Sequence, residues 1–255
     1  MRFSNKIKRF LGLSASIANA EFKLRNEGSY LGILWYLLNP ILLFTLLFFI
    51  FKDRLSNDIP SYHLYLLLGI IMFNLFQEAS LDAARAIKNY SGIIKSIDFP
   101  KESLIGAILL RRLYSHFFEV ILFILIIFLF GGSMAGLLYY PLILILFLAF
   151  IYGACLILSS LVVYFVDLDN MWGFFVRLLW LATPIFYSIG GQNRLLLFNI
   201  FNPLYYFINL GREVVIYQNT PSIWLVAGAF LYSAIFLLAG IIVFTKLKSK
   251  FAELI

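Results

Sequence analysis

Residues 25–51 read RNEGSYLGILWYLLNPILLFTLLFFIF and pass from polar to wholly apolar within a few helical turns. Charged and amide side chains come first, two glycines follow, and a Trp-Tyr pair precedes Asn39-Pro40, a turn-forming dipeptide. Proline is tolerated in the first turn of a helix, and neighbouring groups absorb a kink in a membrane helix. The stretch therefore predicts a hinge between an interfacial segment and a membrane-spanning helix that begins near Leu34.

The whole chain has the composition of a polytopic membrane protein. Its 255 residues are 62% hydrophobic and 13% charged, with mean hydropathy +0.93, whereas a soluble domain carries about 25% charged residues. A helix needs about 20 mostly apolar residues to cross ~30 Å of hydrocarbon. Six stretches meet this requirement: Leu34–Phe51, Tyr62–Ala79, Leu113–Phe130, Leu137–Val166, Met171–Ile189 and Ile223–Thr245. We therefore predict an all-α membrane protein with six transmembrane helices.

The lengths of these stretches and of their connections suggest one domain. The fourth stretch is longer than one perpendicular crossing needs, so we expect it to tilt, to bend near Gly153 or to protrude into the interface. Two connections are long, Ser80–Arg112 and Gly190–Ser222. We expect a single transmembrane domain over 1–255, made of an N-terminal amphipathic segment, a six-helix bundle and a tail: 1–30, 34–245 and 246–255.

Lysine and arginine are distributed unevenly about these spans. The N-terminal segment, the Ser80–Arg112 connection and the tail carry most of them, whereas the other side holds Lys52, Arg54, Arg194 and Arg212. Basic residues accumulate on the cytoplasmic side of membrane proteins. With six spans, both termini are therefore predicted to be cytoplasmic.

The segment before the first span is amphipathic. Its apolar residues recur at near-helical spacing, with Lys6, Lys8 and Arg9 between them. A basic amphipathic helix of this kind lies in the headgroup plane of a membrane. Simple attachment to anionic lipid and contact with a substrate both stay open.

The chain carries no motif for covalent chemistry. No stretch fits G-x-x-x-x-G-K-[ST], so no phosphate-binding P-loop is present. Cys155 is the sole cysteine, and His63 and His116 match no zinc spacing, so no metal site is expected. SIGGQ at 188–192 resembles an ABC ATPase signature but is interpreted as a Gly-Gly turn on the outer face. We expect neither catalytic residues nor a cofactor in this chain.

Ionisable groups within the spans are costly, which makes them candidate functional residues. Arg112, His116 and Glu119 share one face of the third stretch, because their spacing follows the helical repeat. Arg177 lies within the fifth stretch. A Glu119–Arg177 pair between helices would neutralise both charges. Contact of these groups with an anionic or sugar substrate is the alternative.

Aromatic residues make up 18% of the chain and gather around the fifth stretch. Aromatic rings stack on the C–H faces of sugars, and Trp and Tyr add a polar group, so such a surface would let a polysaccharide slide. Helix packing and an interfacial aromatic belt are the alternative. The candidates for a substrate surface are Trp35, Tyr36, Tyr164, Phe165, Trp172, Phe175, Trp180 and Tyr187.

Four segments resemble parts of ABC-2-type permeases that export polysaccharides. LRNEGSYLGILWYLLNPIL (24–42) is similar to the start of their first transmembrane helix, and NYSGIIKSIDFPKESL (89–104) to the cytoplasmic loop between helices two and three. TPIFYS (183–188) resembles the end of their fifth helix, and FNPLYYFINLGRE (201–213) the segment before their last helix. The segments occur in family order and most resemble the membrane subunit of O-antigen polysaccharide exporters (the Wzm type).

The resemblance implies a half-transporter in the bacterial inner membrane. It would pair with a second copy of itself and with two separate ATPase subunits, which bind ATP and Mg²⁺. It would export a lipid-linked polysaccharide through a channel between the two copies, lined by the first and fifth helices. No nucleic acid is implied as a partner.

The resemblance also implies roles for three groups of residues. A coupling helix that contacts the ATPase would include Lys88, Asn89, Tyr90, Ile93, Ile94 and Lys95. Short re-entrant or interfacial gate helices within 199–217 would carry Asn202, Pro203, Tyr205 and Tyr206. Contacts to the lipid pyrophosphate at the channel entrance would come from Arg2, Lys6, Lys8 and Arg9.

Three other functions are compatible with parts of the sequence. An ABC-2 exporter of a small hydrophobic compound or drug would share the topology. A membrane-embedded glycosyl or phosphoglycosyl transferase should show clustered carboxylates at the cytoplasmic interface, where Asp167 and Asp169 are more simply interpreted as a tight turn. A channel acting alone would form no complex with an ATPase.

Overall fold

The computed structural model describes residues 2–27, 32–55, 58–190 and 192–254, and within those ranges the regular structure is helical. Five helices of this part of the chain are long and apolar enough to cross a membrane. They are α2 (Trp35–Leu55), α3 (Tyr62–Asn89), α5 (Glu102–Leu129), α6 (Tyr140–Tyr164) and α10 (Ile223–Leu247). The prediction of an all-α membrane protein is confirmed at this level.

The other helices are not long and apolar enough to be candidate spans. They are α1 (Arg2–Glu27), η1 (Gly32–Leu34), α4 (Ser91–Ser96), η2 (Ala135–Tyr139), α7 (Leu168–Ala182), α8 (Asn193–Ile200), α9 (Pro203–Gly211), the π-helical turn η3 (Arg212–Ile216), η4 (Lys248–Lys250) and α11 (Phe251–Leu254). The predicted span Met171–Ile189 overlaps α7, which begins earlier, at Leu168, and whose 15 residues extend about 22 Å. Six crossings and re-entrant helices stay predictions.

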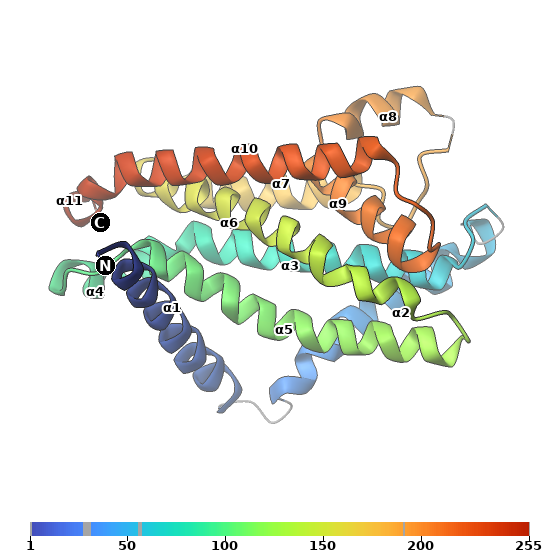
Figure 1. Ribbon diagram of the computed structural model, residues 1–255, viewed down its shortest axis with the longest axis horizontal. Coiled ribbons are helices and arrows are strands. Elements are labelled where there is room, and N and C mark those ends of the chain that lie inside the picture. The colour runs from blue at the N-terminus through green and yellow to red at the C-terminus, as the bar shows by residue number, and fades with distance from the viewer. Residues whose placement is uncertain (1, 28–31, 56–57, 191, 255) are drawn as a thin grey trace.

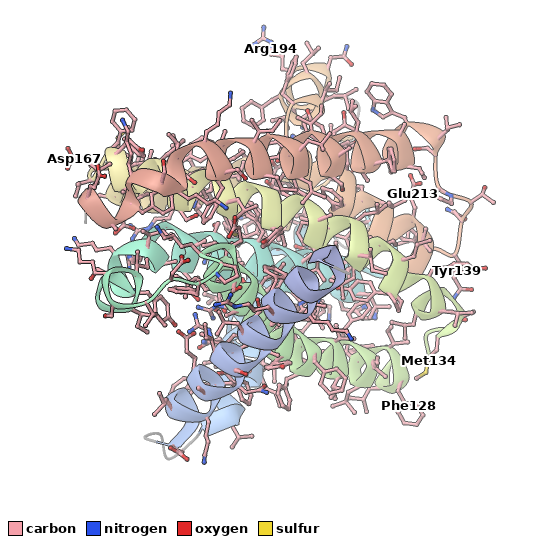
Figure 2. The ribbon with its side chains drawn as sticks, turned by 60° about the vertical axis from the view of Figure 1, so that its left-hand side comes forward. Phe128, Met134, Tyr139, Asp167, Arg194 and Glu213 are labelled. Atoms are coloured by element: carbon pink, nitrogen blue, oxygen red, sulfur yellow. The ribbon has the colours of Figure 1, made fainter. Side chains whose placement is uncertain are left out.

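The long helices run side by side, and α1 crosses them obliquely (Figure 1). Both chain termini, α4 and α11 lie at one end of the bundle, which we call the terminal end. We call the opposite end, where α8 and α9 lie, the distal end. In Figure 2, Asp167 marks the terminal end, whereas Met134, Tyr139 and Glu213 lie toward the distal end.

The central helix is α3. Residues Leu66 to Phe73 include a run of fully buried apolar side chains that point in every direction around the helix, as expected for a helix surrounded by others. In the most apolar window of α3, 78% of the residues are buried, against 17% in α2 and in α10. The outer faces of α2 and α10 are therefore available to lipid or to another chain.

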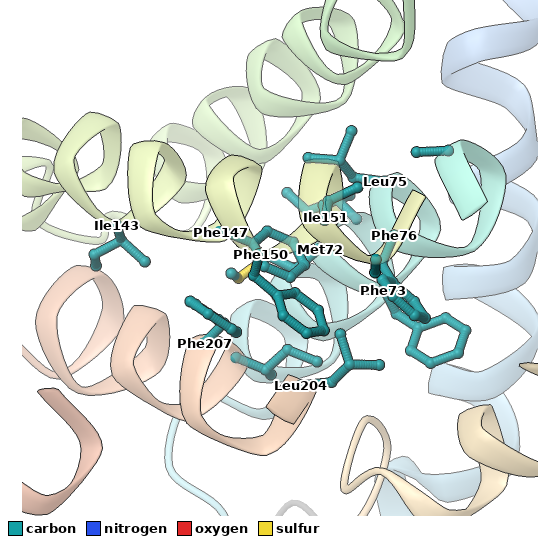
Figure 3. Close-up of a cluster of buried hydrophobic side chains, with 14 of the residues drawn as sticks. Met72, Phe73, Leu75, Phe76, Ile143, Phe147, Phe150, Ile151, Leu204 and Phe207 are labelled. Atoms are coloured by element: carbon teal, nitrogen blue, oxygen red, sulfur yellow. The ribbon is translucent and has the colours of Figure 1, made fainter. Parts of the chain in front are cut away.

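Aromatic packing holds α9 against the bundle (Figure 3). The ring of Phe207 in α9 lies 4.9 Å from that of Phe147 and 5.3 Å from that of Phe150, both in α6. Phe76 of α3 stacks on Phe150 at 5.7 Å. Offset aromatic pairs of this kind add to the hydrophobic contribution of burial. They fix α9 to α6, and α6 in turn to α3.

Helices α6 and α10 approach each other until their backbones touch. A Cβ atom added to Gly153 would collide with the Phe236 carbonyl oxygen, and one added to Gly240 with the Gly153 carbonyl oxygen. Small residues permit this close approach in membrane proteins. Ser233 also donates a hydrogen bond of 2.7 Å to the Leu146 carbonyl oxygen. The helix α6 continues through Gly153, which serves as a packing point.

The stretch around Pro40 folds differently from the expected first turn. Helix α2 begins at Trp35, so buried Pro40 lies inside it, where a proline has no N–H to donate to the preceding helical turn. The 3₁₀ turn η1 precedes the helix. The predicted hinge includes residues 28–31, which lie outside the described part of the chain.

Candidate functional site

A cluster of charged residues ties α1 to the bundle near the terminal end. Arg111 of α5 donates hydrogen bonds to Glu21 of α1 and, at 2.5 Å, to Asp82 of α3. Arg112 donates to Asp82 at 2.7 Å and to Glu78. Burial raises the pKa of Glu21 above that of an ordinary glutamate, and Arg111 opposes this shift. Each arginine thus has two carboxylate partners, as cations that are poorly solvated require.

A second polar group lies deeper in the bundle. His116 Nδ1 is 3.0 Å from Glu119 Oε2, and His116 Nε2 is 2.7 Å from the hydroxyl of Tyr140 in α6. All three side chains are buried. The spacing of His116 and Glu119 had predicted a shared helix face, and their contact confirms it.

The predicted Glu119–Arg177 pair is wrong. Glu119 finds its partner, His116, on its own helix, and Arg177 is exposed. The physical reason is the placement of α7, which packs against α3 and α6. Glu119 faces the interior of the bundle from α5, and the exposed side of α7 points away from it.

Helix α7 buries a narrow stripe and exposes the rest of its surface. Val176 is buried, and the indole Nε1 of Trp172 donates a 3.1 Å hydrogen bond to Ser80 Oγ of α3. Trp180 packs on Phe186 with 5.4 Å between ring centroids. The exposed face holds large apolar side chains and one cation: Met171, Phe174, Phe175, Arg177, Leu178 and Leu181.

The cation on that face lies well within α7. Arg177 stands eight residues after Asp169, which is about 12 Å along the helix. Asp169 itself lies at the start of α7, where both of its carboxylate oxygens are 3.0 Å from Arg85 Nε. A charged side chain inside a membrane faces the protein interior or a water-filled cavity. If α7 crosses the membrane as the sequence predicts, this face would need water or a polar partner around Arg177.

Helix α2 also presents an exposed face and a packed face. Trp35 is 45% exposed, and Asn39 and Leu42 follow it on the exposed side. Tyr36 is buried, and its ring stacks on Phe22 of α1 at 5.9 Å and on Phe118 of α5 at 6.2 Å. Of the two adjacent rings, only Trp35 is placed to meet another molecule.

The remaining predicted substrate aromatics divide in the same way. Phe165 and Phe175 are exposed. The Tyr164 hydroxyl donates a 3.3 Å hydrogen bond to the Leu247 carbonyl oxygen, which joins the ends of α6 and α10. The Tyr187 hydroxyl donates to the Ala182 carbonyl oxygen at 2.8 Å. Tyr164 and Tyr187 therefore have structural contacts, and Phe165 and Phe175 extend the exposed aromatic surface.

The terminal end presents α4 as a short projecting helix. Within this helix the side chain of Ile94 is buried, whereas those of Ile93 and Lys95, and of Ile97 just after the helix, are exposed. Lys88 and Asn89 are also exposed, and Tyr90 links α3 to α4. Among the predicted lipid-pyrophosphate contacts, Lys8 and Arg9 are exposed, and Arg9 Nη2 donates to the Asp98 carbonyl oxygen at 3.3 Å. The side chains of Arg2 and Lys6 lie outside the described part of the structure.

At the distal end, Asn202 caps α9. Its Oδ1 accepts a 3.1 Å hydrogen bond from the Leu204 backbone N–H, and Pro203 occupies the first turn. Its Nδ2 donates to Thr183 Oγ1 at 2.8 Å, which joins α9 to the turn after α7. Tyr206 is buried, and its hydroxyl donates to the Ile200 carbonyl oxygen at 2.9 Å.

Sequence reasoning missed the importance of Arg212, which is only 1% exposed. Its guanidinium donates to the carbonyl oxygens of Pro184 at 2.7 Å, Ile185 at 2.9 Å and Tyr65 at 3.2 Å. The guanidinium carbon lies 3.3 Å from the centre of the Tyr65 ring. Within the described residues, no carboxylate forms an ion pair with it. The available signal was a single basic residue between apolar runs.

Comparison with known proteins finds similarity over most of the chain. Residues 14–216 match the family model described as "ABC-2 type transporter". A relative from Klebsiella pneumoniae, "O-antigen export system permease protein RfbA", is 29% identical over 99% of this chain and 100% of its own. A Myxococcus xanthus protein of the same name is 22% identical over 99% of each chain.

Proposed function

The chain belongs to the ABC-2 type transporter family, and on this basis we propose that it is the permease subunit of an exporter of lipid-linked polysaccharide in the bacterial inner membrane. Two copies would enclose a channel, and two separate ATPase subunits would supply the energy. The full-length relatives named O-antigen export permeases support the class of substrate. The missing P-loop supports a separate ATPase.

The exposed face of α7 is the observation that carries the channel. It combines Phe175 with Arg177, and if α7 crosses the membrane the cation would need water there. Helix α2 adds exposed Trp35 and Asn39. Two copies that place these faces around a shared passage would hydrate Arg177 and line the wall with aromatic rings.

The expected movement of substrate follows from this surface. Sugar rings stack on aromatic side chains without a deep binding minimum, so a glycan would slide past Trp35 and Phe175. A polymer longer than the membrane is thick does not fit in one alternating cavity, which favours a continuous gated channel. The gate would be formed at the distal end by α8 and α9, with Asn202, Pro203, Tyr205 and Tyr206.

The terminal end would face the cytoplasm. Helix α4 would contact the ATPase through exposed Ile93, Ile97 and Lys95, and would pass movement to α3, which it directly follows. Helix α1 would lie in the headgroup plane, where Lys8 and Arg9 would meet the lipid pyrophosphate by charge-assisted hydrogen bonds.

Export assays with matched variants test the channel. In cells that depend on this chain, Phe175→Ala and Arg177→Gln are expected to reduce surface polysaccharide while the complex with the ATPase still copurifies. Phe128→Ala is the control, because Phe128 is exposed on α5 (Figure 2). Trp172→Ala and Trp180→Ala should also slow export, but they remove packing as well. Normal export in both the Phe175 and the Arg177 variants would contradict a channel along α7.

A second experiment separates this function from its alternatives. Ile93→Asp and Ile97→Asp are expected to abolish copurification with the ATPase, because each places a charge on the exposed surface formed by α4 and the residue that follows it. A chain that never binds an ATPase would instead be a channel acting alone. Loss of drug tolerance with normal surface polysaccharide after deletion would identify an exporter of small hydrophobic compounds.

A further inference from the structure

A polar pocket of about 250 Å³ lies at the distal end, between three segments that are far apart in the sequence. Asp58 comes from the connection between α2 and α3, and Tyr65 from α3. Ser188 comes from the turn after α7, and Tyr205 and Asn209 from α9. Tyr217, just beyond η3, completes the wall.

Hydrogen bonds fix the walls of this pocket. The Tyr65 hydroxyl donates to the Tyr187 carbonyl oxygen at 2.7 Å, and the Tyr217 hydroxyl to the Pro60 carbonyl oxygen at 3.2 Å. Asn209 Nδ2 donates to the Tyr205 carbonyl oxygen at 2.9 Å. These bonds join the three segments, so the pocket is already formed without a ligand.

Arg212 supports the pocket from behind. It donates to the carbonyl oxygens of Tyr65 and Pro184, and its Nη1 lies 3.2 Å from Asn209 Oδ1. Tyr65, Pro184 and Asn209 all line the pocket, so one buried side chain holds three parts of its wall. A site held in this way loses little freedom when a ligand binds.

Two polar groups of the wall remain available. Across the described residues, neither the Asp58 carboxylate nor the Tyr205 hydroxyl makes a hydrogen bond within the chain, and Asp58 is exposed. A carboxylate accepts hydrogen bonds, whereas a phenol donates and accepts them. Vicinal sugar hydroxyls bind groups of this kind, and the C–H faces of the ring stack on tyrosine.

We infer that this pocket binds one neutral sugar residue of the exported glycan; the inference rests on the proposed function. Asp58 would repel a carboxylate or phosphate. The Arg212 donors that point to the pocket wall are already bonded to carbonyl and amide oxygens, so they do not serve an anion. Polar lining groups make the pocket a poor site for a lipid chain. A weak subsite here would hold the leading part of the glycan between successive cycles of ATP hydrolysis by the ATPase.

Saturation-transfer NMR on the purified full-length protein tests the inference. The probes are the methyl α-glycosides of D-mannose, D-galactose and D-glucose, at millimolar concentration, with methyl glucuronide as the anionic comparison. At least one neutral glycoside is expected to bind, and more tightly than the glucuronide. Tyr205→Phe and Asp58→Ala are each expected to weaken binding by about fivefold, since each removes one hydrogen-bonding group.

Tyr139→Phe is the matched control, because Tyr139 is an exposed tyrosine toward the same end of the molecule (Figure 2). Size-exclusion profiles establish that every variant is folded. Absence of binding for all three neutral glycosides, or equal binding by wild type and both pocket variants, would overturn the subsite. The proposed function fails separately, if deletion of the chain leaves surface polysaccharide unchanged.

Discussion

Arg212 organises the distal end through backbone contacts. Guanidinium offers five N–H donors in a fixed plane, and here the acceptors are carbonyl oxygens and an amide oxygen, with the Tyr65 ring against the guanidinium plane. Carbonyl dipoles and the aromatic face together offset the loss of hydration. The residue joins η3 to α3 and to the turn after α7, and thereby determines where the distal helices sit.

Replacing Arg212 should lower stability in a graded way. Arg212→Met leaves several buried carbonyl groups without donors, at about 1–3 kcal/mol each, so we expect a loss of roughly 6–12 °C in melting temperature for a total near 3 kcal/mol. Arg212→Lys keeps the charge but reaches fewer carbonyls, so its loss should be smaller. Size-exclusion melting curves in detergent measure both. A methionine variant as stable as wild type would contradict this role.

His116 satisfies two buried groups at once. His116→Phe removes the histidine that contacts both the Glu119 carboxylate and the Tyr140 hydroxyl, which we expect to cost about 3–5 kcal/mol. The triple variant His116→Phe, Glu119→Met, Tyr140→Phe removes all three polar groups and should recover most of the lost stability. The comparison is made from melting curves of the two variants. Equal destabilisation by both would show that the polar groups do not act together.

At the residue scale, spacing predicted neighbours within a helix but not between helices. It placed His116 and Glu119 on one face correctly, because the helical repeat is a local property. It paired Glu119 with Arg177 wrongly, because the packing of α7 against α3 and α6 depends on the whole bundle. It also treated Trp35 and Tyr36 alike, although adjacent residues on a helix point in different directions.

At the scale of elements, the apolar runs predicted where the long helices lie, but the ends of the helices differ from the ends of these runs. The predicted stretch Tyr62–Ala79 continues as α3 to Asn89, because the helix extends beyond its apolar part. The stretch Met171–Ile189 stops being helical at Ala182. Pro184 explains this end, since a proline disfavours helical conformation in the residue before it.

The contact between α6 and α10 makes a prediction about small residues. Gly153→Ala and Gly240→Ala each place a methyl group against a facing backbone, so both should separate the helices and lower the melting temperature. Gly173→Ala in α7 is the control, because nothing lies within 4 Å of its Cβ position. It should be neutral or stabilising, as alanine favours helix by about 1 kcal/mol over glycine. A stable Gly153 variant would show that the two backbones can move apart freely.

At the scale of the whole molecule, the orientation in the membrane can be measured directly. Cys155 is the sole cysteine of the sequence, so a Cys155→Ala background gives a chain without cysteine. Lys95→Cys and Lys250→Cys lie at the terminal end, and Arg194→Cys lies on α8, where Arg194 points away from the bundle (Figure 2). With an impermeant maleimide on intact spheroplasts, only the Arg194 variant should be labelled. Labelling of the two lysine positions instead would reverse the predicted orientation.

The sequence anticipated the class of fold and the location of the distal and terminal segments, because apolar length and charge distribution are properties of the chain itself. The polar pocket could not be anticipated. Its wall joins Asp58, Ser188 and Tyr205, whose proximity arises only when α3, α7 and α9 assemble. Arg212 was likewise counted as a charge on a loop, because burial cannot be deduced from a single basic residue.

The close contact of α6 with α10 also has a consequence for biogenesis. When the ribosome completes α6 at Tyr164, the chain as far as Leu247 remains to be made, which takes roughly 4–17 s at about 5–20 residues per second. During that interval, the surface of α6 around Gly153 lacks the helix that covers it in the folded chain. A nascent chain that stalls before α10 would therefore keep this surface of α6 uncovered, so the bundle can close only after the last long helix has been made.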